Sequence, residues 1–295
     1  MRSASVRTFH ADEFSPADLV DAKGATTVSL CLPARNEEST VGLIVDEIRH
    51  ALIDSIPLVD EIVVVDDHSS DDTAAVARDA GARVVDAAEV LVGYGEGHGK
   101  GEALWKSLHE ARGDVVGWVD ADIREFDAKF VVGLIGPLLL DPTVDFVKGF
   151  YERPEFTGIG GGRVTELAAR PLLSMFFPEL TSVFQPLGGE YAGRRSVLEQ
   201  LPFVVGYGVD VALLIDIARR CGVGRIAQVD LGVRHHRNRS LAELGPQSYA
   251  VISAILGRAG VDVASEHVLY RPDGATPIVI DERPPIAQVR LDGAA

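Results

Sequence analysis

The first half of this 295-residue chain predicts an α/β fold built around a mostly parallel sheet. Short apolar runs typical of strands alternate with segments that carry apolar residues at helical spacing. Such a β-α-β rhythm gives parallel strands joined by right-handed crossovers. Ligands of open α/β sheets bind beyond the carboxyl ends of the strands, so polar residues at those ends are the first candidates for a site.

The elements of the first half follow one another without long gaps. Residues 26–33 form a β-branched run that predicts a strand, and residues 37–52 carry isoleucine, valine and leucine at helical spacing. Residues 61–67 are a continuous apolar run ending in acids, as in a strand buried on both faces. The further expected elements are a helix capped by Ser70 and Asp71 and running through Ala80, a strand at 82–86, a helix from the glycine-rich loop 93–101 to about Arg112, and a strand at 114–119.

The second half is less regular. We expect strands at 144–151, 188–193 and 226–230, and helices beginning near Val164 and covering 211–220 and 249–258. From Pro272 on the chain is rich in Pro, Asp and Arg, and we expect an irregular tail. No repeat or linker divides the chain, which predicts a single domain of two parts.

Composition narrows the class of protein. Lys and Arg total 28 and Asp and Glu total 44, a net charge of −16 that argues against a nucleic-acid or anionic-membrane binder. Hydrophobic residues at 46% predict a sizeable core. Cys31 and Cys221 cannot make a disulfide framework, and their apolar surroundings predict buried thiols and a cytoplasmic protein. We expect neither a signal peptide nor a transmembrane segment.

Two acidic motifs follow predicted strands. Asp120 and Asp122 flank Ala121, and residues at i and i+2 of an extended chain project to the same side. Two carboxylates there can hold a divalent cation together with a substrate phosphate, although one acid could instead cap the next helix. Asp66 and Asp67 could accept hydrogen bonds from a base or ribose, and the alternative is turn and capping chemistry.

Three basic or glycine-rich segments are candidate anion sites. The loop 93–101 ends in Lys100 and Gly101; it is not a Walker A sequence, yet glycine-rich backbone at a helix start offers N–H groups to anions, and the alternative is a flexible surface loop. The stretch GGGRVTE (160–166) puts Arg163 at a helix start, where it is either an anion ligand or a solvated residue beside a hinge. The run RHHRNR (234–239) could face a phosphate, the protein's own carboxylates or a nucleic acid, and one of its histidines could ligate a metal.

Together these segments resemble GT-A-fold glycosyltransferases, and more narrowly the actinobacterial glucosyl-3-phosphoglycerate synthases. The likeness runs from about residue 28 to 260. The segments that carry it are LPARNEE (32–38), VVDDHSSDDT (64–73), GKGEALWKSL (99–108), the Asp120-Ala121-Asp122 motif, VKGFYERP (147–154), GGGRVTELAARPLL (160–173), QPLGGEYAGRR (185–195), GYGVD (206–210) and AQVDLGVRHHRNR (227–239).

The resemblance implies a Rossmann-like nucleotide-sugar-binding half at 26–125 and a smaller acceptor-binding part at 126–260, between an N-terminal extension (1–25) and a C-terminal tail (261–295). It implies a homodimer, with UDP-glucose as donor and 3-phosphoglycerate as acceptor. The metal, Mg²⁺ with Mn²⁺ as a substitute, would be held by Asp122 and His236. The implied catalytic residues are Asp210, Arg163 and Asp122. Donor-binding residues would be Pro33, Ala34, Arg35, Glu37, Asp67, Lys100, Asp120, Ala121, Tyr207, Asp210 and Arg234. Acceptor-binding residues would be Gly162, Arg163, Val164, Thr165 and Asn238.

The sequence departs from the family at two places. Position 210 is Asp where the relatives usually have Glu, and the segment between Pro154 and Gly160 is short. The resemblance implies retention of configuration; because no protein nucleophile is evident, we expect attack on the leaving-group face. Three alternatives remain: a mannosyl-3-phosphoglycerate synthase using GDP-mannose, a polyprenyl-phosphate glycosyltransferase, for which a membrane-binding C-terminal segment is lacking, and a nucleotide-sugar-binding protein without turnover.

Overall fold

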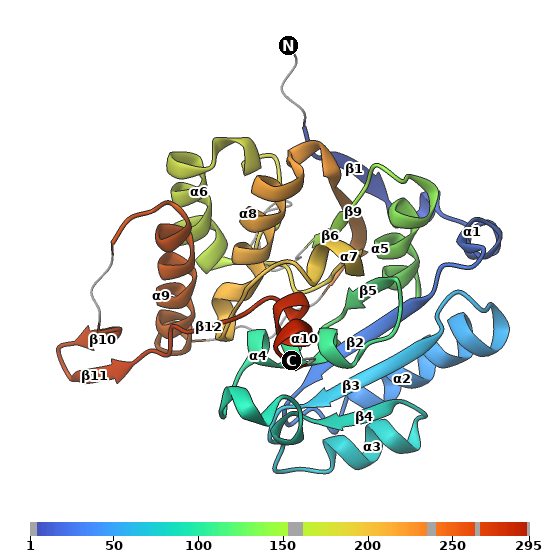
Figure 1. The fold of residues 1–295 in the computed structure, drawn as a ribbon, viewed down its shortest axis with the longest axis horizontal. Helices are drawn as coiled ribbons and strands as arrows, with labels where there is room; N and C mark the ends of the chain where they lie inside the picture. Colours follow the sequence, from blue (N-terminus) through green and yellow to red (C-terminus); the bar gives the residue numbers. More distant parts are fainter. Residues whose placement is uncertain (1–4, 153–161, 235–239, 263–265, 294–295) are drawn as a thin grey trace.

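The computed structural model describes residues 5–152, 162–234, 240–262 and 266–293. Its centre is an eight-stranded sheet in the order β1-β9-β6-β7-β5-β2-β3-β4 (Figure 1). All neighbouring strands are parallel except at β7, which is antiparallel to both β5 and β6. The expected mostly parallel α/β sheet is therefore confirmed. The strands of this sheet are β1 (Arg7–His10), β2 (Val28–Ala34), β3 (Glu61–Asp66), β4 (Arg83–Asp86), β5 (Val115–Trp118), β6 (Phe146–Glu152), β7 (Tyr191–Arg194) and β9 (Ile226–Val233).

Helices cover both faces of the sheet (Figure 1). One apolar cluster joins α4, α6, α8, α9 and α10 to one face, and a second joins α1, α2 and α5 to the other. The α-helices are α1 (Pro16–Lys23), α2 (Val41–Arg49), α3 (Thr73–Asp79), α4 (Lys100–Glu110), α5 (Lys129–Leu140), α6 (Arg170–Phe176), α7 (Arg195–Leu198), α8 (Val209–Cys221), α9 (Leu241–Arg258) and α10 (Ile286–Gly293). A turn of π-helix at Thr165–Ala169 leads into α6.

Strand β2 shows how the sequence sets the layers. Cys31 faces one cluster, while Leu30 and Leu32 face the other, and all three side chains are fully buried. Successive side chains of a strand point to opposite faces, so an uninterrupted apolar run is what a strand covered on both sides requires. Of the two free cysteines, Cys31 is buried and Cys221 is only half-buried, so the prediction of two buried thiols is half wrong.

Two helices begin later than predicted. α2 starts at Val41 rather than at Glu37, because the backbone amide of Glu37 donates to Thr73 Oγ1 at 2.8 Å and residues 37–40 form a turn. α3 starts at Thr73 with Asp72 at its cap position, so the predicted cap at Ser70 and Asp71 is wrong. Asp71 instead accepts a bond of 3.1 Å from the backbone amide of Thr73.

The N-terminal residues add an edge to the sheet. β1 pairs in parallel with β9, with Arg7 opposite Ala227, and α1 packs against α5. Lys23, at the end of α1, is buried and lies 2.8 Å from a carboxylate oxygen of Asp60.

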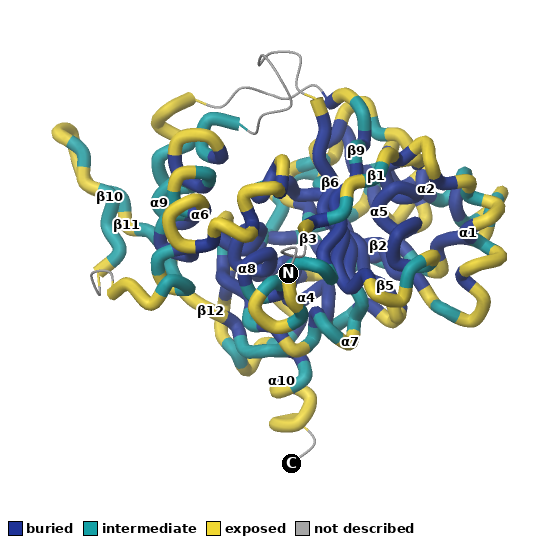
Figure 2. The backbone as a smooth tube through the Cα atoms, turned by 90° about the horizontal axis from the view of Figure 1, so that it is seen from above, coloured by how far each residue is buried: buried dark blue, intermediate teal, exposed yellow. Residues whose placement is uncertain are grey.

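The prediction of an irregular C-terminal tail is wrong. β10 (Val268–Arg271) and β11 (Gly274–Pro277) form a hairpin, β12 (Glu282–Arg283) pairs with β8 (Phe203–Val204), and α10 buries Ile286 and Val289. Figure 2 shows the hairpin projecting with its outer end exposed, beside α9. Arg283 in β12 is buried, and its Nε donates to the buried Glu102 carboxylate at 2.6 Å.

Candidate active site

The three predicted ligand-binding segments meet at one edge of the sheet. β5, β2 and β3 are adjacent and parallel, so their carboxyl ends lie side by side. The backbone amide of Asp67 donates to Ala34 O at 2.8 Å, and the hydroxyl of Thr40 donates to Ala121 O at 2.7 Å. Residues 33–38, 66–70 and 120–122 thus form one continuous wall.

Lys100 occupies the centre of this wall. Its ammonium Nζ lies 2.9 Å from Asp120 Oδ1 and 3.4 Å from Asp210 Oδ1. Burial opposes the charge, but the carboxylates of Asp120 and Asp210 more than offset it and raise the pKa of Lys100 above its usual value. The lysine is therefore a fixed cation at the start of α4.

Two glycines allow this close approach. A Cβ on Gly101 would overlap the carbonyl oxygen of Val204, so the Ser or Thr of a Walker A loop has no room here. A Cβ on Gly189 would overlap the Asp120 carboxylate and reach within 2.5 Å of Lys100 Nζ. Glycine at position 101 thus lets α4 pack closely against the backbone of β8, and this packing places Lys100 next to the strand ends.

A second cation, Arg234, lies near the other carboxylate oxygen of Asp120. Its guanidinium pairs with Glu190, lies 2.9 Å from Asp122 Oδ1 and reaches 3.8 Å from Asp120 Oδ2. Arg234 is 5% exposed and Glu190 is 1% exposed, and burial raises the pKa of Glu190 although Arg234 opposes that shift. The sequence left a phosphate, the protein's own carboxylates or a nucleic acid as partners for the basic run 234–239. In this structure Arg234 pairs with the protein's own carboxylates.

Asp210 closes the cluster at the start of α8. Its side chain is buried, and this burial raises its pKa although Lys100 and Lys148 oppose the shift. The shorter acid at this position still reaches Lys100.

Lys148, to which the sequence assigned no role, lies close enough to Asp210 for their charges to interact. Its Nζ donates to Gly188 O at 2.7 Å and sits 4.4 Å from the centre of the Tyr191 ring. Burial lowers the pKa of Lys148 to about 8, against the pull of Asp210. The sequence did not predict that Lys148, Glu190 and Tyr191 would lie at this site; the available signals were the scarcity of lysine in this chain and the family-like GGEYAG segment.

Other predicted donor residues line the rim. Pro33 and Ala34 end β2, while Arg35 beyond them is exposed. Burial, followed by the charge of Asp122, raises the pKa of Glu37 to about 7. Tyr207 is 44% exposed in the turn before α8.

The predicted acceptor residues lie at the start of the π-helical turn. Thr165 is buried, whereas Gly162, Arg163 and Val164 are half-buried, and the turn packs against α9. Asn238 and the predicted metal ligand His236 lie outside the described residues.

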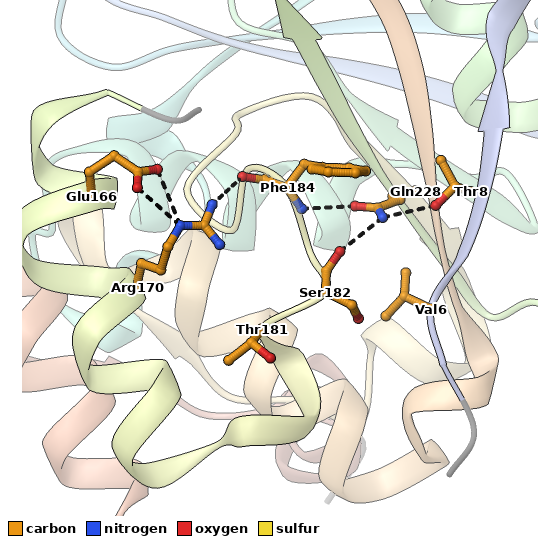
Figure 3. Close-up of a pocket in the computed structure, with 8 residues that line it drawn as sticks. All are labelled: Val6, Thr8, Glu166, Arg170, Thr181, Ser182, Phe184 and Gln228. Atoms are coloured by element: carbon orange, nitrogen blue, oxygen red, sulfur yellow. Dashed lines mark hydrogen bonds and ion pairs between the residues drawn. The ribbon is translucent and has the colours of Figure 1, made fainter. Parts of the chain in front are cut away.

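A separate cavity of about 560 Å³ opens near the β1 edge of the sheet (Figure 3). Arg170 spans it, pairing with Glu166 at 3.2 Å and donating to Phe184 O at 2.8 Å. No predicted site residue is among its lining residues, which are Val6, Thr8, Glu166, Arg170, Thr181, Ser182, Phe184 and Gln228. The strand ends, rather than this cavity, therefore remain the candidate site.

The acidic group at the strand ends has the ligand chemistry of a site for a hard divalent cation. Asp120, Asp122 and Glu190 bring three carboxylates around the single guanidinium of Arg234. Glu190 Oε2 is buried and has no hydrogen-bond partner in the described part of the chain. Oxygen ligands of this kind suit Mg²⁺ and Mn²⁺.

Comparisons with known proteins agree with this geometry. Residues 29–201 match the family model for glycosyl transferase family 2. The glucosyl-3-phosphoglycerate synthase of Mycolicibacterium smegmatis is 47% identical, covering 93% of this chain and 93% of that protein. The enzyme of that name from Petrotoga mobilis is 42% identical, covering 96% of this chain and 94% of that protein.

Solved structures give the same result. The Mycobacterium tuberculosis glucosyl-3-phosphoglycerate synthase in complex with Mn²⁺, UDP-glucose and phosphoglyceric acid is 44% identical, with a TM-score of 0.89 over 97% of this chain and 99% of that chain. The mannosyl-3-phosphoglycerate synthase of Rubrobacter xylanophilus is 42% identical, with a TM-score of 0.87 over 96% of this chain and 97% of that chain. Among the described residues, no helix has the length and apolar character needed to span a bilayer.

Proposed function

This chain belongs to glycosyl transferase family 2 and, within it, to the glucosyl-3-phosphoglycerate synthases, and on this premise we propose that it transfers glucose from UDP-glucose to the 2-hydroxyl of 3-phosphoglycerate. It is then a retaining hexosyltransferase of the GT-A fold. The observation that carries the proposal is the meeting of Lys100, Asp120 and Arg234 at the carboxyl ends of parallel strands. That edge is where an α/β sheet binds a nucleotide.

The donor would lie along the wall of strand ends. Pro33, Ala34, Arg35 and Asp67 line the uridine pocket in this proposal, and Glu37 faces the ribose. Lys100 and Arg234 are the cations nearest the diphosphate, and Asp120 and Ala121 pass beneath it. Their buried position strengthens these charges, because little water remains to screen them.

A divalent cation would be held by Asp122, with His236 as the second protein ligand. We propose Mg²⁺, with Mn²⁺ able to replace it; the Mycobacterium tuberculosis structure contains Mn²⁺ with UDP-glucose. When bound, the ion supplies charge neutralisation of the leaving diphosphate. Arg234 already pairs with Asp122, so the guanidinium and the cation would share that carboxylate.

The acceptor would bind through residues of the second half of the chain. Arg163 and Thr165 hold the phosphate of 3-phosphoglycerate in this proposal, with Gly162, Val164 and Asn238 completing the cradle. An arginine offers a bidentate fork that matches phosphate oxygens. Tyr207 and Asp210 face the glucose and the attacking hydroxyl.

The reaction exchanges one C–O bond for another. The 2-hydroxyl oxygen of the acceptor bonds to the anomeric carbon of glucose, and the bond from that carbon to the diphosphate breaks. The hydroxyl proton passes to the departing diphosphate. Because the hydroxyl attacks on the same face that the diphosphate leaves, the configuration of the anomeric carbon is retained. Residues that hold the acceptor hydroxyl on the leaving-group face of the sugar convert a bimolecular step into an effectively intramolecular one.

The decisive experiment mixes the protein with UDP-glucose, 3-phosphoglycerate and Mg²⁺ and follows UDP release and product formation by mass spectrometry. We expect turnover that depends on both substrates and on the cation. No release with 3-phosphoglycerate, together with turnover on another acceptor, would sink the assignment.

A donor panel separates the second candidate function. The likeness to the Rubrobacter xylanophilus enzyme favours a test of GDP-mannose beside UDP-glucose at equal concentration. We expect a higher kcat/KM with UDP-glucose. Calorimetric binding of UDP-glucose without product from any acceptor would instead make the chain a nucleotide-sugar-binding protein.

We further propose that residues 26–125 and 126–260 act as the donor and acceptor halves of one domain, between the N-terminal extension 1–25 and the C-terminal tail 261–295. The protein is proposed to act in the cytoplasm as a homodimer. Light scattering on the purified chain tests the dimer; a mass of one chain at working concentration would exclude it.

A further inference from the structure

Three potential metal ligands gather where β3 ends and the glycine-rich loop begins. The Nδ1 atom of His68 lies 3.0 Å from Asp67 Oδ1, and the Nδ1 atom of His98 lies 4.0 Å from that same oxygen. The two Nδ1 atoms are 3.3 Å apart. The three atoms form a compact triangle on the rim of the strand-end wall, and in the described part of the chain this is the group of His, Cys, Asp and Glu side chains that meets the geometry of a metal site.

The triangle has the size of one face of a zinc tetrahedron. With Zn–N and Zn–O bonds of about 2.0–2.1 Å, ligand atoms of a tetrahedral site are about 3.4 Å apart. The observed separations of 3.0, 3.3 and 4.0 Å bracket that value. A single ion can therefore reach all three atoms with small side-chain shifts, and a fourth position stays open toward solvent.

The three atoms contact one another, since His68 Nδ1 lies within hydrogen-bond distance of both Asp67 Oδ1 at 3.0 Å and His98 Nδ1 at 3.3 Å. Asp67 uses its second oxygen, Oδ2, to accept the backbone amide of Gly99 at 2.8 Å, which turns Oδ1 toward the histidines. The histidine rings stand edge to face with centroids 4.3 Å apart, and their Nδ1 atoms lie within hydrogen-bond distance of each other. One shared proton can satisfy that pair, but it leaves a strong acceptor, Asp67 Oδ1, beside both rings.

The backbone of His68 adds a second indication. His68 has a φ of +60°, a left-handed conformation that is uncommon for a residue with a side chain. Such a conformation persists where the surroundings impose it, and it is enriched at sites that bind ligands. In this conformation the imidazole Nδ1 lies 3.0 Å from Asp67 Oδ1.

We propose that Asp67, His68 and His98 bind one zinc ion through Oδ1 and the two Nδ1 atoms. Imidazole nitrogens favour Zn²⁺ over Mg²⁺, whereas the oxygen-rich group at Asp120 and Asp122 favours the harder ion. The zinc ion would connect the end of β3 to the loop that precedes Lys100. Because Asp67 also lines the uridine pocket in the proposed function, this inference concerns the protein without bound donor, and its test measures binding by residues 67, 68 and 98 rather than activity.

The test measures Zn²⁺ binding by calorimetry in excess Mg²⁺, with full-length protein that carries His236→Ala. That background removes the histidine proposed for the Mg²⁺ site. We expect one equivalent of Zn²⁺ to bind. Adding His98→Ala or His68→Ala should weaken it at least tenfold, while adding His50→Ala, at an exposed histidine elsewhere, should leave it unchanged. Co²⁺ in place of Zn²⁺ should give the visible bands of a four-coordinate site without a thiolate charge-transfer band.

Three results would overturn the proposal. They are no saturable Zn²⁺ binding in the His236→Ala protein, equal affinity after His98→Ala, and a thiolate band that assigns the ion to Cys221. Misfolding does not blur these outcomes, because the His98 side chain is 53% exposed and thermal melting without metal should match between the variants.

Discussion

The ammonium of Lys100 lies 2.9 Å from the carboxylate of Asp120, so the first residue of α4 is joined to the segment just beyond β5. Asp210 at the start of α8 shares the same ammonium. One cation thus holds together three segments that are distant in sequence, and its position depends on glycine at 101 and 189. Several expectations rest on this arrangement.

Replacing Lys100 should disable donor binding. Lys100→Met leaves Asp120 and Asp210 facing each other without their shared cation, and removing one partner of a buried ion pair costs about 3–5 kcal/mol. We expect UDP-glucose affinity and kcat/KM to fall at least about 100-fold, as for loss of a preorganised charge in an active site. Calorimetry and initial rates measure both. Lys129→Met, at an exposed lysine, is the control, and a Lys100→Met protein with wild-type donor affinity would refute the role.

Asp122→Ala and Arg163→Ala should separate the two substrates. Both should abolish or greatly reduce turnover. Asp122→Ala should lose the cation-dependent part of UDP-glucose binding and keep 3-phosphoglycerate binding, because Asp122 lies with the acidic group at the strand ends. Arg163→Ala should lose 3-phosphoglycerate binding and keep UDP-glucose binding. Binding titrations of each substrate decide the matter, and wild-type rates in either variant would contradict its assignment.

Gly101→Ser tests why this loop departs from the Walker pattern. The added side chain would overlap the Val204 carbonyl, and overpacking of a tight contact costs typically about 1–3 kcal/mol. We expect lower stability in urea denaturation and weaker donor binding, since Lys100 would shift with α4. Gly93→Ala is the matched control, because a Cβ there meets no atom within 4 Å. Equal stability of Gly101→Ser and wild type would show that α4 can move without cost.

Lys148 should make stability depend on pH in the alkaline range. Burial lowers its pKa to about 8 in the folded state, from the ordinary lysine value of 10.5. Between these two pH values the unfolded chain holds a proton that the folded chain has released. The contribution of Lys148 to the free energy of unfolding therefore rises as pH increases from about 8 to 10.5, and it falls again as pH decreases through this range. In Lys148→Met that increment should vanish. The comparison needs urea midpoints of both proteins from pH 7.5 to 10, and parallel curves would show that Lys148 keeps an ordinary pKa.

Arg283 should be essential for stability although it lies near the chain's end. Arg283→Ala would leave the fully buried Glu102 with the Lys106 ammonium, at 3.1 Å, as its remaining ion-pair partner among the described residues, and breaking such a buried pair costs about 3–5 kcal/mol. Arg290→Ala removes an ion pair whose arginine is 45% exposed, and should cost about 1 kcal/mol or less. Chemical denaturation compares the two, and similar losses would mean that Glu102 finds another partner.

The parts that could be predicted from the sequence are those with a strong local signal. β2, β3 and β5 are apolar runs because both their faces are covered, and the polar residues after them had to meet because parallel strands end at one edge. β1 and the segment after Pro272 gave no such signal. Their short, half-exposed elements are defined by distant partners, such as Val204 for β12 and Glu102 for Arg283. The placement of Lys148 and Glu190 in the site likewise depends on how β6 and β7 pair.

The pairing of β1 with β9 also bears on how the chain is made. Gln228 donates to Thr8 across 220 residues of sequence. At the roughly 5–20 residues per second of protein synthesis, that separation corresponds to about 10–45 s during which the first strand has no partner. Contacts so distant in sequence also slow folding. Strand β1 is therefore among the last strands to be incorporated into the sheet, because its partner β9 is synthesised so much later.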